Sequence, residues 1–258
     1  MILVDTHTHL YLEEFKEDRD EVIKAAINED VTYMLLPRID SESHEAQMEL
    51  SNRFPENCLP MMGLHPTSVN NNFEQELNVV KEGLKEGSYI GIGEIGIDLY
   101  WDDTFKEQQE YVFRHQLQMA KEYKLPVSIH TRDSFDVVYR IVREEHTEDL
   151  KGVFHCFTGT PEEARMIMDL GFSMGIGGIL TFKNAGLAEV VREIPLEYLV
   201  LETDSPFLTP VPYRGKRNQS KYVVFIAKKL AEIKEISIEQ VAETTTANAA
   251  ELFKLNIQ

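Results

Sequence analysis

The chain has 258 residues, of which 43% are hydrophobic, so it is long enough to bury a sizeable core. It carries 26 Lys and Arg against 44 Asp and Glu, and the resulting formal charge of −18 argues against a protein that coats nucleic acid. There is no basic leader, no apolar run of transmembrane length and no pattern of closely spaced cysteines, which predicts a cytoplasmic protein without membrane contact or a disulfide framework.

Short β-type runs recur along the chain, and each is followed by a charged amphipathic stretch. They cover residues 2–4, 32–36, 59–63, 89–93, 127–129, 152–154, 172–176 and 198–201. This alternation predicts parallel βα units, and eight of them in a chain of about 250 residues match one (β/α)8 barrel. A doubly wound open sheet is the competing α/β architecture. We therefore expect an α/β fold with one TIM-barrel domain over residues 1–258.

The stretches between the strands are predicted to be helical. Residues 105–123 form one such helix and residues 161–170 another, which Thr160 is placed to cap. A helix over 221–235 and a short one over 238–255 close the chain. We see no linker, internal repeat or domain boundary.

Histidines and acids gather where predicted strands end, which is where barrel active sites are built. After the first strand, Asp5, His7 and His9 alternate with threonines, and the two-residue period of a strand places both imidazoles on one face. The fourth, fifth, sixth and eighth strands lead into Glu94, His130, His155 and Asp204. Four imidazoles and two carboxylates exceed the needs of a single ion, so we expect two divalent cations bridged by a carboxylate.

A glycine-rich string, three further histidines and one cysteine are expected to have structural roles. The string GIGEIG over residues 91–96 matches a dinucleotide fingerprint but opens no helix, so its glycines are expected to make room near the metals. Three further histidines, His44, His115 and His146, are expected on helix surfaces or at caps. Cys156 follows His155, so the strand period turns it toward the helices as a small apolar filler.

The motifs together resemble those of the TatD-type metal-dependent deoxyribonucleases. They are DTHTH at 5–9, GLHP at 63–66, GEIGID at 93–98, IHTR at 129–132, HCFTG at 155–159 and ETDSP at 202–206, followed by RGKRN at 214–218. The resemblance runs nearly end to end. It implies an amidohydrolase-type barrel with a two-metal site that hydrolyses DNA, often from a 3′ end.

The resemblance also implies which residues hold each ion. The first metal would lie among His7, His9, Glu94 and Asp204, and the second among Glu94, His130 and His155. The sequence does not distinguish Mg²⁺, Mn²⁺ and Zn²⁺ as the bound ions. One departure concerns the segment after Asn218, where the family often continues with an acid and a proline whereas this chain has Gln219 and Ser220.

Several residues receive expected roles beside the metals. Asp204 would position the attacking water and take its proton, and Glu202 would act as a second acid or orient a metal ligand. Arg132 would clamp a phosphate oxygen, and His65 would face the substrate rather than a metal. A local basic rim is expected from Lys183, Arg214, Lys216 and Arg217.

Two other functions compete with this interpretation. An amidohydrolase that cuts C–N or ester bonds can use the same barrel and the same His-x-His start, although it often bridges two metals with a modified lysine where this chain has Glu94. A barrel that binds metal without catalysis would show a broken ligand set, and this sequence shows none. We expect a DNA substrate held by its end, no obligate protein partner and a monomer.

Overall fold

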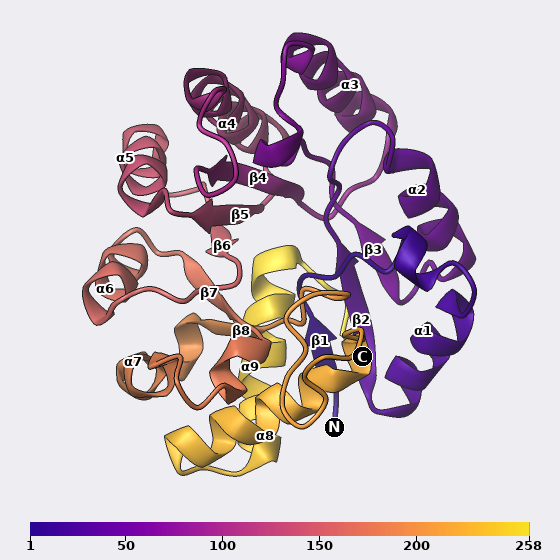
Figure 1. Ribbon diagram of the computed structural model, residues 1–258, viewed down its shortest axis with the longest axis vertical. Helices are drawn as coiled ribbons and strands as arrows, with labels where there is room; N and C mark the ends of the chain where they lie inside the picture. The colour runs from indigo at the N-terminus through magenta and orange to yellow at the C-terminus, as the bar shows by residue number, and fades with distance from the viewer. Residues whose placement is uncertain (258) are drawn as a thin grey trace.

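The computed structural model describes residues 1–257, and within them eight parallel strands form the centre of the molecule (Figure 1). The strands are β1 (Leu3–Asp5), β2 (Val31–Leu36), β3 (Cys58–Pro60), β4 (Ile92–Asp98), β5 (Val127–Arg132), β6 (Gly152–Phe154), β7 (Ser173–Ile176) and β8 (Leu199–Leu201). Parallel ladders run β1-β2-β3 and β4-β5-β6-β7-β8. Single bridges from Thr8 to Ser205 and from Met62 to Ile92 join the two sheets and close the barrel.

Helices surround the strands in chain order (Figure 1). They are α1 (Arg19–Asn28), α2 (His44–Arg53), α3 (Phe73–Glu86), α4 (Lys106–Tyr123), α5 (Phe135–Glu145), α6 (Pro161–Asp169), α7 (Leu187–Glu193), α8 (Val223–Lys234) and α9 (Ile238–Phe253). The alternation confirms the predicted (β/α)8 barrel. Among residues 1–257, no helix combines the length and apolar character that crossing a membrane requires.

The predicted cap of α6 is present. The Thr160 side chain accepts a hydrogen bond from the backbone of Glu163, whose carboxylate accepts one from the Thr160 backbone in return. This reciprocal pair satisfies two backbone donors that the first turn would otherwise leave free, and Pro161 needs no donor there. Local sequence therefore fixes where α6 begins.

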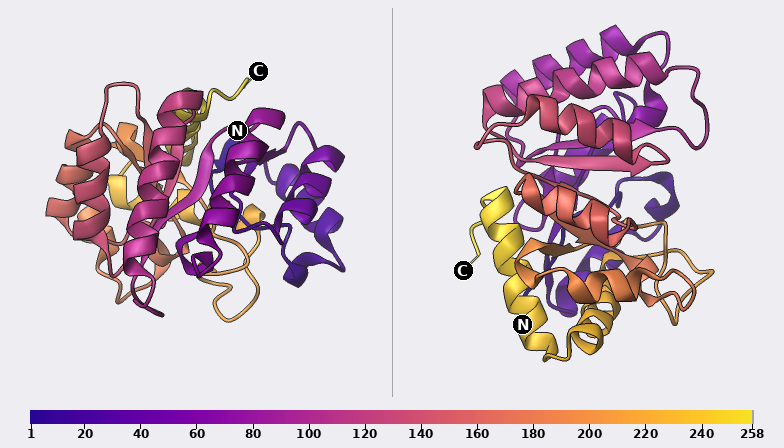
Figure 2. Two further views of the ribbon diagram at one scale, coloured as in Figure 1. Left: turned by 90° about the horizontal axis from the view of Figure 1, so that it is seen from above. Right: turned by 90° about the vertical axis from the view of Figure 1, so that its left-hand side faces the viewer.

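The last helix agrees with its predicted range and has a structural task. α9 has 16 residues over Ile238–Phe253, close to the predicted 238–255, although a helix of this length is not short. Its Phe253 packs with Val4, Leu35 and Val200, which point into the barrel from three strands. The N-terminus and the end of α9 lie at the same end of the molecule (Figure 2). α9 thus closes the end of the barrel where the strands begin, and the opposite end is left for the site.

The fourth strand contains the acidic motif. β4 begins at Ile92 and continues to Asp98, and all seven of its residues are buried. It pairs with β5 through Gly96 opposite His130 and Asp98 opposite Arg132. The β-type run predicted over residues 89–93 therefore starts too early, while its continuation into Glu94 is confirmed. The strand holds Glu94 on rigid backbone.

A buried carboxylate helps to join the first and last strands. Asp5 accepts hydrogen bonds from the Thr203 backbone N–H at 2.8 Å and from the Thr203 hydroxyl at 2.6 Å. Burial raises the pKa of Asp5 to about 7 against the lowering effect of its hydrogen bonds with Ser220 and Thr203. These hydrogen bonds align the segment after β1 with the segment after β8, and both segments carry site residues.

Candidate metal centre

Six of the predicted residues converge at the carboxyl end of the barrel. They come from five parts of the fold: His7 and His9 follow β1, Glu94 lies in β4, His130 lies in β5, His155 follows β6 and Asp204 follows β8. Each is buried or nearly so. The strand order of the barrel therefore gathers side chains that are up to 197 positions apart, since 204 − 7 = 197.

Glu94 is at the centre of this cluster, and its two oxygens face different imidazoles. Oε1 lies 2.7 Å from Nδ1 of His130 and 2.7 Å from Nε2 of His155. Oε2 lies 3.1 Å from Nε2 of His7 and 3.4 Å from Nε2 of His9. One carboxylate thus separates two sets of nitrogen donors, which is the arrangement that a bridging ligand requires.

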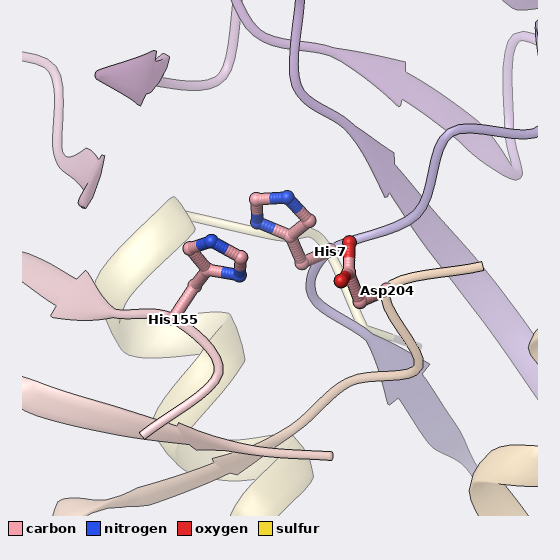
Figure 3. A group of neighbouring side chains, drawn as sticks. All are labelled: His7, His155 and Asp204. Atoms are coloured by element: carbon pink, nitrogen blue, oxygen red, sulfur yellow. The ribbon is translucent and has the colours of Figure 1, made fainter. Parts of the chain in front are cut away.

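Three groups of side chains offer donor atoms close enough to surround an ion. One is His7, His9 and Glu94, a second is His65, Glu94 and His130, and a third is His7, His155 and Asp204. In the third group, the rings of His7 and His155 stack with centroids 3.8 Å apart, and the Asp204 carboxylate lies beside His7 (Figure 3). Imidazole and carboxylate donors suit divalent transition ions, so the residues present fit the metal site that the motifs predict.

The nitrogens that face away from the cluster have partners of their own. His7 Nδ1 lies 3.1 Å from the Ser128 hydroxyl, His9 Nδ1 lies 2.8 Å from the Tyr11 hydroxyl, and His130 Nε2 lies 2.9 Å from an Asp98 oxygen. Such partners fix ring orientation and tautomer, as they do around metal-bound histidines. Sequence reasoning assigned no role to Ser128, Tyr11 or Asp98. The signal available for Asp98 was its even spacing from Glu94 along one strand.

The electrostatics keep the central carboxylate charged. Burial acts to raise the pKa of Glu94, but the imidazoles of His65, His155 and His7 hold it well below its usual range. Burial and the nearby His155 lower the pKa of His7 far below its ordinary value, so this ring is a neutral ligand. Burial also raises the pKa of Asp204 to about 6.

His65 lies closer to the metal donors than predicted. β3 ends at Pro60, and His65 follows in a loop, where its backbone N–H donates to the Ile39 carbonyl. Its Nε2 atom lies 3.2 Å from Glu94 Oε1, while Nδ1 contacts Thr67 at 2.7 Å. The turn after β3 directs the ring to Glu94, and His65 also lines the cavity, so its role toward substrate stays a prediction.

Glu202 lies behind the cluster rather than in it. Its carboxylate is fully buried, lies 3.5 Å from Nδ1 of His155 and accepts a hydrogen bond from the Cys156 backbone at 2.6 Å. It does not line the cavity at the site. Of its two predicted roles, this position corresponds to orienting a ligand and not to acting on water.

Cys156 does not turn toward the helices. Its φ of 50° breaks the two-residue strand period, and the residue lines the cavity that also contains Glu94 and Asp204. The filler interpretation was therefore wrong, because it assumed that strand geometry continues past Phe154. Burial raises the pKa of the Cys156 thiol well above its ordinary value, so the group is uncharged at neutral pH.

The glycines of β4 make room for β5 rather than for ions. A Cβ at Gly93 would lie 2.8 Å from the Ser128 Cβ, and one at Gly96 would lie 2.0 Å from the His130 carbonyl oxygen. Gly96 also has a φ of 142°, which only glycine adopts readily. Close approach of β5 is what brings Ser128 and His130 to their partners.

Glycine 175 offers a test of the Glu202 contact. A Cβ there would lie 2.0 Å from a Glu202 oxygen, whereas at Gly177 the nearest atom would be 3.6 Å away. We expect Gly175→Ala to displace the carboxylate from His155 and to weaken metal affinity about 10- to 100-fold. Metal titration by calorimetry checks this, with Gly177→Ala as the matched control. Equal affinities in the two variants would contradict the assigned role.

The predicted basic residues do not form one rim. Arg217 pairs with Asp18, with one nitrogen–oxygen distance of 2.6 Å, and its guanidinium stacks on Phe15. Arg214 stacks on Phe182 instead. Arg132 lines the cavity, and its contact with a phosphate stays a prediction. The expected rim does not form because the fold places the loop after β8 against the segment before α1.

Comparison with known proteins then identifies the family. A family model described as TatD related DNase matches residues 4–254. The chain belongs to the TatD family. A relative in Bacillus subtilis (strain 168), the uncharacterized metal-dependent hydrolase YabD, is 41% identical over 256 residues, covering 99% of this chain and 100% of YabD.

Two Escherichia coli K12 proteins extend the comparison. The uncharacterized metal-dependent hydrolase YcfH is 36% identical over 260 residues, covering 99% of this chain and 97% of YcfH. The crystal structure of YjjV, a TatD homologue, matches with a TM-score of 0.92 at 25% identity, covering 99% of this chain and 98% of YjjV. With these matches and its clustered donors, the chain is a metal-dependent hydrolase of the TatD family.

Proposed function

We propose that this TatD-family hydrolase cleaves phosphodiester bonds of DNA, removing nucleotides from a 3′ end with two divalent ions. The observation that supports it best is the division of Glu94, whose two oxygens face separate sets of imidazoles. Two ions set a few ångströms apart are the usual means of stabilising an in-line displacement at phosphorus. The family description as a DNase favours DNA as the substrate.

The donors divide into two sets around Glu94. His7, His9 and Asp204 would hold one ion, and His130 and His155 the other, with His65 close to the second set. Divalent ions bound there would polarise the phosphate and lower the pKa of water from 15.7 toward about 7.

The side chains of the chain itself would orient the reaction. Asp204 lines the cavity with 15% of its side chain exposed, so its carboxylate can hold a water and accept its proton. Glu202 would orient His155 from behind, since it contacts that ring and does not line the cavity. Arg132 lines the same cavity, and its guanidinium can form a bidentate pair of hydrogen bonds with a phosphate group.

A metal-rescue nuclease assay tests the proposal. The protein is stripped with chelator, Mg²⁺, Mn²⁺ or Zn²⁺ is added back singly, and DNA labelled at either end is followed beside matched RNA. We expect stepwise shortening from the 3′ end only when metal is present. Absence of cleavage by protein that binds two ions would contradict the proposal and favour a C–N or ester hydrolase on the same barrel.

The remaining expectations concern the state of the protein. Action as a monomer, on DNA rather than RNA, is part of the proposal, and the same assay compares the two nucleic acids directly. The cytoplasmic location stays a prediction of the sequence.

A further inference from the structure

Arg38 is completely buried next to the metal centre, and the hydrolytic role proposed above does not use it. It follows β2 with Pro37 between them, and its side chain has no exposed surface. A charged side chain is rarely buried to this degree unless it has a defined set of partners. The partners of Arg38 therefore show what its burial achieves.

The backbone of Arg38 holds the peptide group that leads into Glu94. Its N–H donates to the Gly93 carbonyl at 2.8 Å, and its carbonyl accepts a hydrogen bond from the Glu94 N–H at 3.0 Å. One residue thus pairs with both polar groups of the peptide between Gly93 and Glu94. Arg38 comes from the β2 side of the barrel, although β3 lies between β2 and β4.

Regular strand pairing gives this peptide little support. A single bridge between Met62 and Ile92 joins β3 to β4, and the ladder between β4 and β5 shifts register between Ile92 and Ile95. Irregularities of this kind often re-aim a side chain next to an active site. The direction of the Glu94 carboxylate therefore needs a further support, and the backbone of Arg38 supplies it.

The preceding residue, Pro37, supports a second candidate ligand through Tyr11. The Tyr11 hydroxyl donates to the Pro37 carbonyl at 2.6 Å, so its oxygen accepts the hydrogen bond from Nδ1 of His9 at 2.8 Å. The proton of His9 is then on Nδ1. Its Nε2 atom, which faces Glu94 Oε2 at 3.4 Å, is left with a lone pair for a metal.

The guanidinium of Arg38 ties this segment to parts of the chain outside the site. Nε donates to the Asp40 carbonyl at 2.7 Å, Nη1 lies 3.0 Å from the Met62 sulfur, and Nη2 lies 3.6 Å from a Glu76 oxygen on α3. The same Glu76 oxygen accepts a hydrogen bond from the Ser41 backbone at 3.0 Å. A planar fork with donors on several edges can hold these segments together.

We propose that Arg38 is a positioning residue for the metal centre, whose buried guanidinium anchors the segment that sets the directions of Glu94 and His9. Arg38 does not line the cavity of the site, so it acts through the hydrogen bonds of this segment and not on substrate. The proposal concerns metal binding alone. It therefore stands or fails independently of which bond the hydrolase cuts.

Arg38→Met tests the anchor, because methionine fills part of the same space without a charge or a donor. We expect metal affinity to fall about 10- to 100-fold, the usual effect of losing a group that orients a ligand. Calorimetric titration of the chelator-stripped protein with Mn²⁺ or Zn²⁺ measures this change. The visible absorption of the Co²⁺-loaded protein should also shift, since it reports the geometry of the ligands and not the stability of the fold.

Gln47→Met is the matched control. Gln47 is also fully buried, and its amide donates to the carbonyls of Leu36 and Met61 at 2.7 and 2.8 Å, so it joins the ends of β2 and β3 without contacting Glu94. The control should lose stability but keep the metal affinity and the Co²⁺ spectrum of the wild type. Equal losses of affinity in the two variants, or none in either, would refute the positioning role.

Arg38→Lys decides the question if the methionine variant does not fold. Lysine keeps the charge, but one ammonium cannot replace a fork that bonds to the Asp40 carbonyl and approaches Glu76 from another edge. Thermal unfolding in chelator shows that the lysine variant is folded. Its metal affinity should still be reduced, and an affinity equal to that of the wild type would overturn the proposal.

Tyr11→Phe tests the connection to His9. The ring keeps its buried place, and only the hydroxyl between His9 and the Pro37 carbonyl is lost. We expect metal affinity to fall about ten-fold. In the double variant with Arg38→Met the loss should be smaller than the product of the single losses, because both changes release the same segment. Fully multiplicative losses would show that Arg38 does not act through Pro37.

Discussion

Glu94→Gln is expected to lower the rate of hydrolysis by at least about 10³-fold, because two ions supply several kcal/mol of charge stabilisation and each 1.36 kcal/mol is a factor of ten. The amide keeps the size of the side chain but removes the charge that faces five imidazoles within 3.4 Å. Bound metal should fall from two ions per chain toward one or none. Elemental analysis and the nuclease assay measure the two effects.

Thermal unfolding separates a lost metal site from a lost fold. Metal that binds only the native state raises the melting temperature, so the wild type should melt higher with metal than with chelator. Glu94→Gln should show little of this difference. Glu56→Gln, at an exposed position after α2, should behave as the wild type. If Glu94→Gln kept two ions and full activity, the assigned centre would be wrong.

Asp204→Asn is expected to reduce kcat by about 10²- to 10⁴-fold, the usual contribution of a positioned proton acceptor. The amide fits the same space and the left-handed backbone, with φ of 54°, that Asp204 adopts after β8. Its far-UV circular dichroism should be unchanged. Single-turnover rates with saturating DNA measure the effect on the chemical step.

Asp133→Asn is the matched control for this variant. Asp133 is also a carboxylate after a barrel strand with a left-handed backbone, at φ of 52°, but it is exposed and lines a neighbouring pocket without Glu94. Its kcat should stay within about two-fold of the wild type, as for most surface changes. Similar losses in both variants would argue against a specific role for Asp204.

Much of the site was predictable because it is encoded locally. The two-residue period of a strand and the rule that barrel sites lie at carboxyl ends placed His7, His9 and Glu94 at one mouth. The strand alternation and the capping signal before α6 depend on neighbours in sequence, and both were predicted correctly. Such features need no knowledge of long-range contacts.

The same rules failed where the backbone leaves the strand geometry. Cys156 has a positive φ of 50°, so counting by twos past the end of β6 assigned its side chain the wrong direction. His65 reaches Glu94 through a turn after β3 whose path depends on the Ile39 carbonyl. No local sequence pattern predicts these turns.

The sequence by itself determined the barrel and the residue types available at its mouth. The hydrophobic period of the strands, the spacing of the βα units and the chemistry of the side chains can all be read from neighbouring residues. Tertiary structure alone decided which imidazoles face each oxygen of Glu94, and that Asp98, Tyr11 and Ser128 hold the outer nitrogens. The physical reason is closure of the barrel. Distances between side chains from different strands are set by how β1 meets β8 and how closely β5 approaches the glycines of β4.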